Sequence, residues 1–199
     1  MVIMGKNKEL NKKDAEKVFY LEYADLFGLA KYKAIMDNVN PLNDVFQKKF
    51  VSFYKLRGLD KDKLRKFFMF FDKCKKNKWD LSYDKILDEL KKITERVEAS
   101  FASKMLATLD DSKPILDQFV LKYLGLEIEG SSPDDRLQSV KKIYKEIDDW
   151  YGKFLKSSEG KSCVRFFNEK FPDYKSISDV KKIDCFLWRL GKEDSVDDD

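Results

Sequence analysis

Apolar residues recur every three to four positions along almost the whole sequence, and this spacing constrains the fold more than any other feature. It is the spacing of one buried face on an α-helix, whereas a half-buried strand alternates at every second residue. The chain of 199 residues contains only 8 Gly and 4 Pro, too few for the many tight turns of a β protein. The sequence therefore predicts an all-α protein with eight or nine helices.

The length and composition fit a globular helical domain. A chain of 199 residues can bury a sizeable core, and 43% hydrophobic with 38% charged residues is typical of a folded protein with a charged surface. We expect a single domain over residues 1–190, arranged as two lobes with a groove near residues 98–130. A disordered acidic tail is expected over residues 191–199.

Capping residues, glycines and prolines indicate where the expected helices begin and end. The first helix is expected to run from Asp14 to about Met36, and the next is expected to carry Val45, Phe46, Phe50, Phe53 and Tyr54. A long helix is expected from Asp134 to about Lys156, ended by the SSEG sequence at 157–160. The remaining signals are the N-cap candidates Asp60, Ser82 and Ser178, the first-turn proline Pro133 and the terminating glycine Gly191.

Basic residues are concentrated in the first part of the chain. Residues 1–80 hold 19 Lys and Arg against 11 Asp and Glu, while the whole chain has a formal net charge of only +4. Such an excess permits contact with nucleic acid or an anionic surface, although lysine-bearing helix faces are commonly just solvated. The most basic helix, expected over 61–76, carries Phe67, Phe68 and Phe71 at the spacing of one buried stripe. We interpret these phenylalanines as core residues and not as a base-stacking surface.

The residue types present exclude several classes of site. The chain contains no histidine, which removes Ser-His-Asp and Cys-His catalysis and histidine metal sites. Its three dispersed cysteines form no CxxC pair. Gly160-Lys161-Ser162 resembles the end of a phosphate-binding loop, but Leu155 stands where the first glycine is required. We therefore predict neither a metal site nor a bound cofactor.

The sequence predicts a protein of the cytoplasm. The first 14 residues lack the apolar core of a signal peptide. No apolar stretch reaches about 18 residues, so no transmembrane helix is expected. An odd number of dispersed cysteines is typical of a reducing compartment.

The segment DSKPILDQFVLKYLGL, residues 111–126, is not explained by core packing alone. We expect a helix with Ser112 or Lys113 as its cap and Pro114 in its first turn, which places Asp117 at the end of that turn. A carboxylate there gains roughly 0.3–1 kcal/mol from the helix dipole, so a structural role is sufficient to explain it. The alternative is that Asp117 is presented for chemistry.

The same segment resembles a motif of the helix–hairpin–helix DNA glycosylase superfamily, P-x-x-D-T-H-V-x-R-x-x-x-R-L-G-L. Asp117 falls on the catalytic aspartate, Val120 on the valine three residues later, and Leu124-Gly125-Leu126 on the closing Leu-Gly-Leu. The preceding residues 98–109 are similar to the helix that follows the hairpin in that family. The resemblance covers residues 86–126. It implies a two-lobed helical fold, double-stranded DNA as the partner, and Asp117 as the catalytic residue of a monofunctional N-glycosylase.

The sequence departs from that family in its hairpin and in the residues around the aspartate. Glu98-Ala99-Ser100 stands in place of the G-x-G hairpin, and Gln118 stands in place of the histidine. The position of the lysine nucleophile of bifunctional members is occupied by Ala99 or Ser100, and we expect Lys104, one helical turn later, to be exposed. Five residues near Asp117 are candidates for DNA contact, namely Ser100, Ser103, Lys104, Lys113 and Gln118.

Two functions therefore remain open. In the first, the protein is a DNA-base N-glycosylase in which Asp117 stabilises an oxocarbenium-like sugar and orients the attacking water. An aspartate carboxyl is ordinarily ionised at neutral pH, so this chemistry needs no histidine. In the second, the protein is a non-catalytic helical scaffold that binds nucleic acid or a protein partner through its basic first 80 residues.

Overall fold

The computed structural model describes residues 10–18, 28–77 and 81–193, and in these ranges all regular structure is helical. The prediction of an all-α protein is therefore confirmed. No helix in these ranges has both the length and the apolar character needed to cross a membrane. The bounds of the elements, in chain order, are α1 Lys12–Val18, α2 Leu29–Met36, α3 Asp44–Tyr54, α4 Lys61–Lys76, α5 Tyr83–Thr94, α6 Ala99–Leu109, α7 Gln118–Leu124, α8 Pro133–Phe154, α9 Ser158–Lys170, the 3₁₀ helix η3 Pro172–Tyr174 and α10 Asp179–Glu193.

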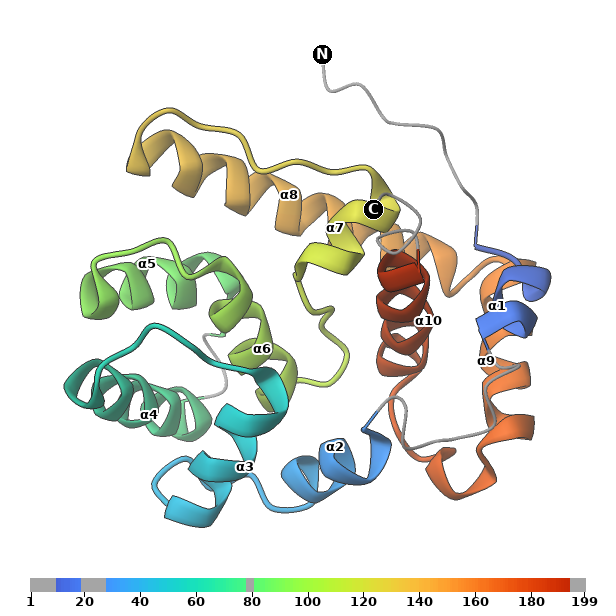
Figure 1. Cartoon of the computed structure of the whole chain (residues 1–199), viewed down its shortest axis with the longest axis horizontal. Coiled ribbons are helices and arrows are strands. Elements are labelled where there is room, and N and C mark those ends of the chain that lie inside the picture. Colours follow the sequence, from blue (N-terminus) through green and yellow to red (C-terminus); the bar gives the residue numbers. More distant parts are fainter. Residues whose placement is uncertain (1–9, 19–27, 78–80, 194–199) are drawn as a thin grey trace.

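The helices lie in two groups with α7 between them (Figure 1). One group consists of α3, α4, α5 and α6, and the other consists of α1, α9 and α10. Helix α8 runs along the top of this view, and α2 lies at the opposite end beside α3. Helix α7 packs against α10, while α5 packs against both α6 and α8. The chain that joins α6 to α7 therefore has to pass between the two groups.

Most helix starts are fixed by a side-chain cap, which accepts hydrogen bonds from backbone N–H groups that have no partner within the helix. The predicted caps Asp60, Ser82 and Ser178 are confirmed, because each side chain accepts a hydrogen bond from the N–H three residues later. At α8, Ser132 is the cap and Pro133 occupies the first helical position, as predicted. These starts were predictable because a cap acts within a few residues of its own position.

An aromatic cluster fills the space between α3 and α4. It consists of Phe46, Phe50, Phe67, Phe68 and Phe71, none of which is more than 4% exposed. Their ring centroids lie 5.1–6.5 Å apart, mostly edge to face, which is an arrangement that aromatic pairs prefer. The interpretation of the α4 phenylalanines as core residues is confirmed.

The predicted helix from Asp14 to Met36 is wrong in its extent. Helix α1 is described as far as Val18 and α2 begins at Leu29, and residues 19–27 lie outside the described part of the chain. Gly28 precedes α2 with a φ of 60°, a left-handed conformation that does not occur inside an α-helix. The described residues consequently form ten α-helices, where eight or nine were predicted.

The structure adds detail at two further places. Val45 is 58% exposed, because it lies one residue, or about 100° of helix rotation, from the face that buries Phe46. The SSEG sequence at 157–160 begins a helix as well as following one. The Ser157 hydroxyl accepts a hydrogen bond from the N–H of Gly160 and thereby caps α9.

Gly191 does not end α10, which continues to Glu193. A Cβ atom at Gly191 would lie 2.3 Å from the carbonyl oxygen of Phe119, so the glycine allows the backbones of α10 and α7 to approach closely. Of the predicted acidic tail, residues 191–193 are therefore helical, and residues 194–199 lie outside the described part of the chain.

Candidate functional site

The connection between α6 and α7, residues 111–117, runs through the interior of the protein and not over its surface. Figure 1 shows it passing between α6 and α10. Pro114, Ile115 and Leu116 at its centre are buried. A buried connection is uncommon, because each backbone N–H and C=O away from water needs a hydrogen-bond partner. The side chains that supply these partners therefore define the 111–117 connection.

Side chains from two helices bind backbone groups at the centre of the connection. The Ser103 hydroxyl, on α6, accepts a 3.0 Å hydrogen bond from the N–H of Leu116 and lies 3.3 Å from the carbonyl oxygen of the same residue. The Tyr144 hydroxyl, on α8, donates to the carbonyl oxygen of Pro114 at 3.2 Å. Ser103 is fully buried and Tyr144 is 5% exposed, so water does not compete for these bonds.

The beginning of the connection is held from two helices. The hydroxyl of Ser178, the cap of α10, donates to the carbonyl oxygen of Asp111 at 2.6 Å. The Nζ atom of Lys113 lies 2.9 Å from a carboxylate oxygen of Asp148 on α8. Helices α6, α8 and α10 thus all contribute contacts to the same seven residues.

Asp117 ends the connection and caps α7. Its Oδ1 atom accepts hydrogen bonds from the N–H groups of Phe119 and Val120, both at 3.0 Å. The predicted helix start at Pro114 is wrong, since the helix begins at Gln118, Asp117 has an extended backbone, and residues 114–116 are not helical. Asp117 is partly exposed. A carboxylate held by two backbone N–H groups therefore reaches solvent at the end of a buried segment.

Lys104 lies half-buried on α6 near this carboxylate, so the prediction that it is exposed is wrong. Its Nζ atom donates to the backbone carbonyl oxygen of Tyr54 at 3.1 Å and lies 5.9 Å from the centre of the Tyr54 ring. Burial lowers the pKa of Lys104, and the Asp117 carboxylate opposes this effect. The two side chains are therefore within electrostatic range of each other.

Buried polar side chains on α8 and α10 face the connection from the other side. The Tyr151 hydroxyl donates a hydrogen bond to Asp184, and the Nζ atom of Lys181 lies 3.9 Å from the second oxygen of that carboxylate. Burial raises the pKa of Asp184 to about 6, while Lys181, Tyr151 and the nearby N–H of Ile115 act to lower it. We use the name polar junction for the side chains of Ser103, Tyr144, Tyr151, Lys181 and Asp184.

The five candidates for DNA contact differ in accessibility. Gln118 is exposed at the first position of α7, and Ser100 is partly exposed. Ser103 is fully buried, so its hydroxyl presents no surface to a phosphate. Lys104 and Lys113 are half-buried, and each is bonded to another part of the protein. Of these five residues, Gln118 directly follows Asp117 and Lys104 is within electrostatic range of it, whereas Ser103 is used inside the protein.

Sequence analysis missed the charged residues of α10. Asp184 stands between Ile183 and Cys185, which are both buried, and is itself only 5% exposed. Lys181 lies one helical turn earlier, and its side chain is 13% exposed. A charge inside an apolar stripe is a recognisable signal, because charged residues are almost never buried unless they are paired. That signal, read without reference to any motif, would have found both residues.

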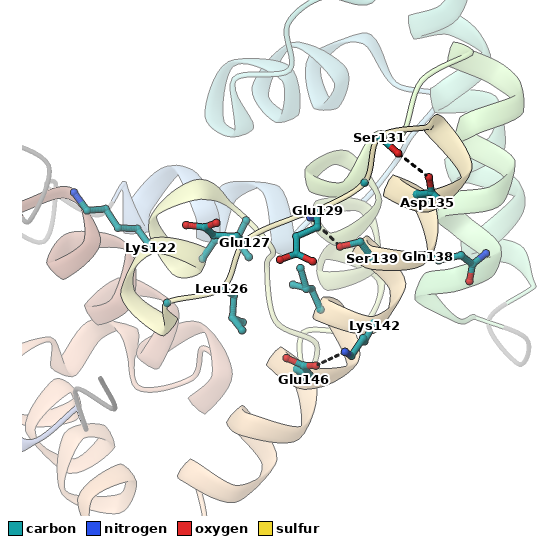
Figure 2. Close-up of a pocket in the computed structure, with 14 residues that line it drawn as sticks. Lys122, Leu126, Glu127, Glu129, Ser131, Asp135, Gln138, Ser139, Lys142 and Glu146 are labelled. Atoms are coloured by element: carbon teal, nitrogen blue, oxygen red, sulfur yellow. Dashed lines mark hydrogen bonds and ion pairs between the residues drawn. The ribbon is translucent and has the colours of Figure 1, made fainter. Parts of the chain in front are cut away.

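An open cavity of about 1010 Å³ lies at the opposite end of α7 from Asp117. Figure 2 shows it between the loop of residues 125–131 and α8. Asp117 does not line this cavity. Its acidic lining residues outnumber the basic Lys122 and Lys142, and they are Glu127, Glu129, Asp135 and Glu146. Such a lining repels a polyanion, so we do not assign DNA to the cavity.

No group of three or more Cys, Asp and Glu side chains in the described ranges is arranged to hold a metal ion. Comparison with protein-family models, curated proteins and solved structures found no match to this chain. Support for a function of the site therefore comes from its own residues and their geometry.

Proposed function

We propose that the protein hydrolyses the N-glycosidic bond between a base and deoxyribose in double-stranded DNA, with Asp117 as the catalytic residue. The observation that supports this proposal is the position of Asp117, a partly exposed carboxylate at the end of a connection held by α6, α8 and α10. A loop that only joins two helices usually lies at the surface, where water supplies these hydrogen bonds. A helix cap alone likewise needs no buried polar network behind it.

The proposed chemistry uses the carboxylate as a fixed negative charge. Positive charge develops on the sugar as the bond to the base breaks, and a carboxylate beside the ring stabilises that charge. Oδ1 of Asp117 accepts the two hydrogen bonds from α7, and no described residue donates one to Oδ2. We assign Oδ2 to the sugar and to the attacking water. The base departs with the bonding electron pair, the water gives OH to the sugar and releases its other proton to solvent, and a proton from solvent completes the base.

Two lysines near Asp117 suit a polyanionic substrate. Burial acts to lower the pKa of both Lys104 and Lys181, while the Asp117 carboxylate raises both. At Lys104 the effect of burial is the larger one, so its pKa is lowered overall. The pKa of Lys181 is raised overall by the groups around it, so Lys181 stays protonated. Its positive charge reduces the repulsion between Asp117 and DNA phosphates.

The substitution Asp117→Asn tests the proposal, because an asparagine amide oxygen caps a helix about as well as a carboxylate does. Single-turnover base release is measured on duplexes that each carry one oxidised, deaminated or alkylated base. We expect the variant to keep wild-type stability while the rate falls about 10²–10³-fold. Asp60→Asn makes the same change at the cap of α4 and should leave the rate unchanged. Undiminished release by Asp117→Asn would remove Asp117 from the mechanism.

A second candidate function is nucleic-acid binding without catalysis through α3 and α4. Lys48, Lys49 and Lys73 are exposed on these helices and form no ion pair with any described residue. In contrast, Arg65 and Lys66 both pair with the same acidic residue of α4, so part of the basic surface is neutralised within the helix. The unpaired lysines favour contact with phosphates, which needs no Asp117.

The salt dependence of DNA binding tests this second function. Each phosphate that a lysine neutralises releases a counterion, so the affinity should fall steeply between 50 and 200 mM salt, by about 10³-fold for six contacts. Changing Lys48, Lys49 and Lys73 together to Ala should reduce the salt slope by about 3. Lys33→Ala, at a lysine that is already paired with Asp37, is the matched control. Binding that does not respond to salt would point to a protein partner instead.

A further inference from the structure

We infer that Ser103 and Tyr144 are positioning residues, which fix the Asp117 carboxylate by holding the 111–117 connection from two sides. The inference rests on the proposed function, because it assigns both residues to the reaction of Asp117. Neither hydroxyl touches the substrate. Each acts through the backbone that leads into Asp117.

Ser103 holds the residue immediately before Asp117. Its hydroxyl accepts the N–H of Leu116 at 3.0 Å and lies 3.3 Å from the Leu116 carbonyl oxygen. It also donates to the carbonyl oxygen of Ser100 at 3.0 Å, which fixes the hydroxyl on α6. The Leu116 N–H belongs to the peptide unit between Ile115 and Leu116, so rotation of that unit would break its hydrogen bond to α6.

Tyr144 holds the connection two residues earlier. Its hydroxyl donates to the Pro114 carbonyl oxygen, and its ring stacks on the ring of Tyr83 with centroids 3.6 Å apart and planes 10° apart. The Tyr83 hydroxyl donates in turn to the carbonyl oxygen of Ala99 at the start of α6. The contact from α8 is therefore itself fixed by a buried partner, and it cannot shift independently of α5 and α6.

Asp184 contacts Ile115, which lies between Pro114 and Leu116. The N–H of Ile115 lies close enough to its carboxylate to lower its pKa, and Tyr151 donates to the same carboxylate. Side chains of α8, α10 and α6 thus contact Pro114, Ile115 and Leu116, respectively. This leaves the backbone before Asp117 no freedom to move toward any of the three helices.

The arrangement controls where Asp117 lies relative to the rest of the site. A helix cap is local to α7 and moves with it, so capping alone does not require Ser103 or Tyr144. The distance from Asp117 to Lys104 on α6 and to Lys181 on α10 does depend on them. Displacement of a catalytic group by about 1 Å can lower a rate about 100-fold, which makes this placement a functional requirement.

The test uses Ser103→Ala and Tyr144→Phe in the full chain. Tyr144→Phe keeps the stacked ring, and alanine suits the interior of α6, so both variants are expected to fold. We expect the single-turnover rate of base release to fall about 10- to 100-fold, with the dissociation constant for DNA changed less than about twofold. The matched control is Thr94→Val, which removes a buried hydroxyl that donates to one backbone carbonyl oxygen and accepts from one backbone N–H outside the connection.

Amide hydrogen exchange supplies a readout that does not depend on activity. The N–H groups of Phe119 and Val120 are bonded to Asp117, and they should exchange about 10-fold faster in both variants but not in Thr94→Val. Suppose that Asp117→Asn abolishes base release. If Ser103→Ala and Tyr144→Phe then keep the wild-type amide protection or the wild-type rate, the positioning role is wrong and the proposed function stands. A third outcome is that the amides exchange faster in Ser103→Ala and Tyr144→Phe but base release is unchanged in Asp117→Asn. In that case Ser103 and Tyr144 do position the carboxylate, and the proposed function is wrong.

Discussion

The aromatic cluster and the polar junction are both buried, but opposite kinds of contact hold them. The cluster consists of five phenylalanine rings, none more than 4% exposed, that meet without any polar atom. The junction places hydroxyls and charges in the interior, including Asp184 at 5% exposure and the Lys181 side chain at 13%. Apolar packing is non-directional, whereas hydrogen bonds weaken steeply when their geometry is lost.

The difference indicates what each region contributes. Burial of apolar surface is the dominant favourable contribution to folding, so the cluster needs no further role to explain it. Buried ion pairs are weak contributors to stability, because removing two charges from water offsets much of their attraction. The polar junction is therefore better explained by the one geometry that it imposes on the 111–117 connection. The predictions below test this division between stability and placement.

The largest effect on stability is expected at the centre of the aromatic cluster. Phe50 is fully buried and contacts rings of α3 and α4. Phe50→Ala should therefore lower the free energy of unfolding by about 3–5 kcal/mol. Denaturant unfolding measures this change. Val45→Ala, on the exposed face of the same helix, should alter stability by less than about 0.5 kcal/mol.

The loss of stability in Phe50→Ala should leave the polar junction intact. The Phe119 and Val120 amides should then keep their protection under conditions where the variant is still folded, because Asp117 still accepts both hydrogen bonds. A Phe50→Ala variant with wild-type stability, or one that releases these two amides selectively, would break the division between the two regions.

A smaller effect, with a distinctive pH dependence, is expected at Asp184. Its pKa of about 6 in the folded protein lies above the unfolded value near 3.9, so the folded state holds the proton more tightly. The stability that this provides is complete below about pH 4 and is lost as the pH rises through 6. It amounts to roughly 3 kcal/mol. Wild type should therefore lose stability relative to Asp184→Asn between pH 4 and pH 6.

Urea unfolding of both proteins at several pH values measures that difference. Asp62→Asn is a control of opposite sign, because hydrogen bonds from Lys66 and Arg65 lower the pKa of Asp62. The contribution of Asp62 is therefore present above its unfolded pKa and is lost as the pH falls. Parallel curves for wild type and Asp184→Asn would show that Asp184 is not a desolvated group facing the connection.

The parts of the fold that the sequence predicts correctly depend on local rules. The phenylalanines of α4 follow helical spacing, and Asp60 lies next to the backbone groups that it caps. The start of α7 was wrong for a reason that is not local. Pro114 is compatible with a first helical turn, but the Leu116 backbone bonds to Ser103, thirteen residues earlier, and this keeps the residues before Asp117 out of the helix.

The candidate site divides in the same way. Asp117 could be singled out from the sequence, because a carboxylate stands among apolar residues in a recognisable motif. That Lys181 and Asp184 lie near it could not be predicted, since they come from α10, more than sixty residues later. Which charged residues meet around Asp117 depends on how α10 packs against α7, and no local pattern specifies that packing.

The smallest effect is expected where α10 approaches α7, close to the end of the polar junction. Gly191→Ala would place a Cβ atom 2.3 Å from the Phe119 carbonyl oxygen, and a backbone atom cannot move aside as a side-chain end can. We expect a loss of about 1–3 kcal/mol in the free energy of unfolding. Gly152→Ala, on α8, meets no atom within 4 Å and should stabilise the protein by up to about 1 kcal/mol. If both substitutions stabilise the protein equally, the close contact between α10 and α7 does not exist, and Lys181 and Asp184 are not held beside Asp117.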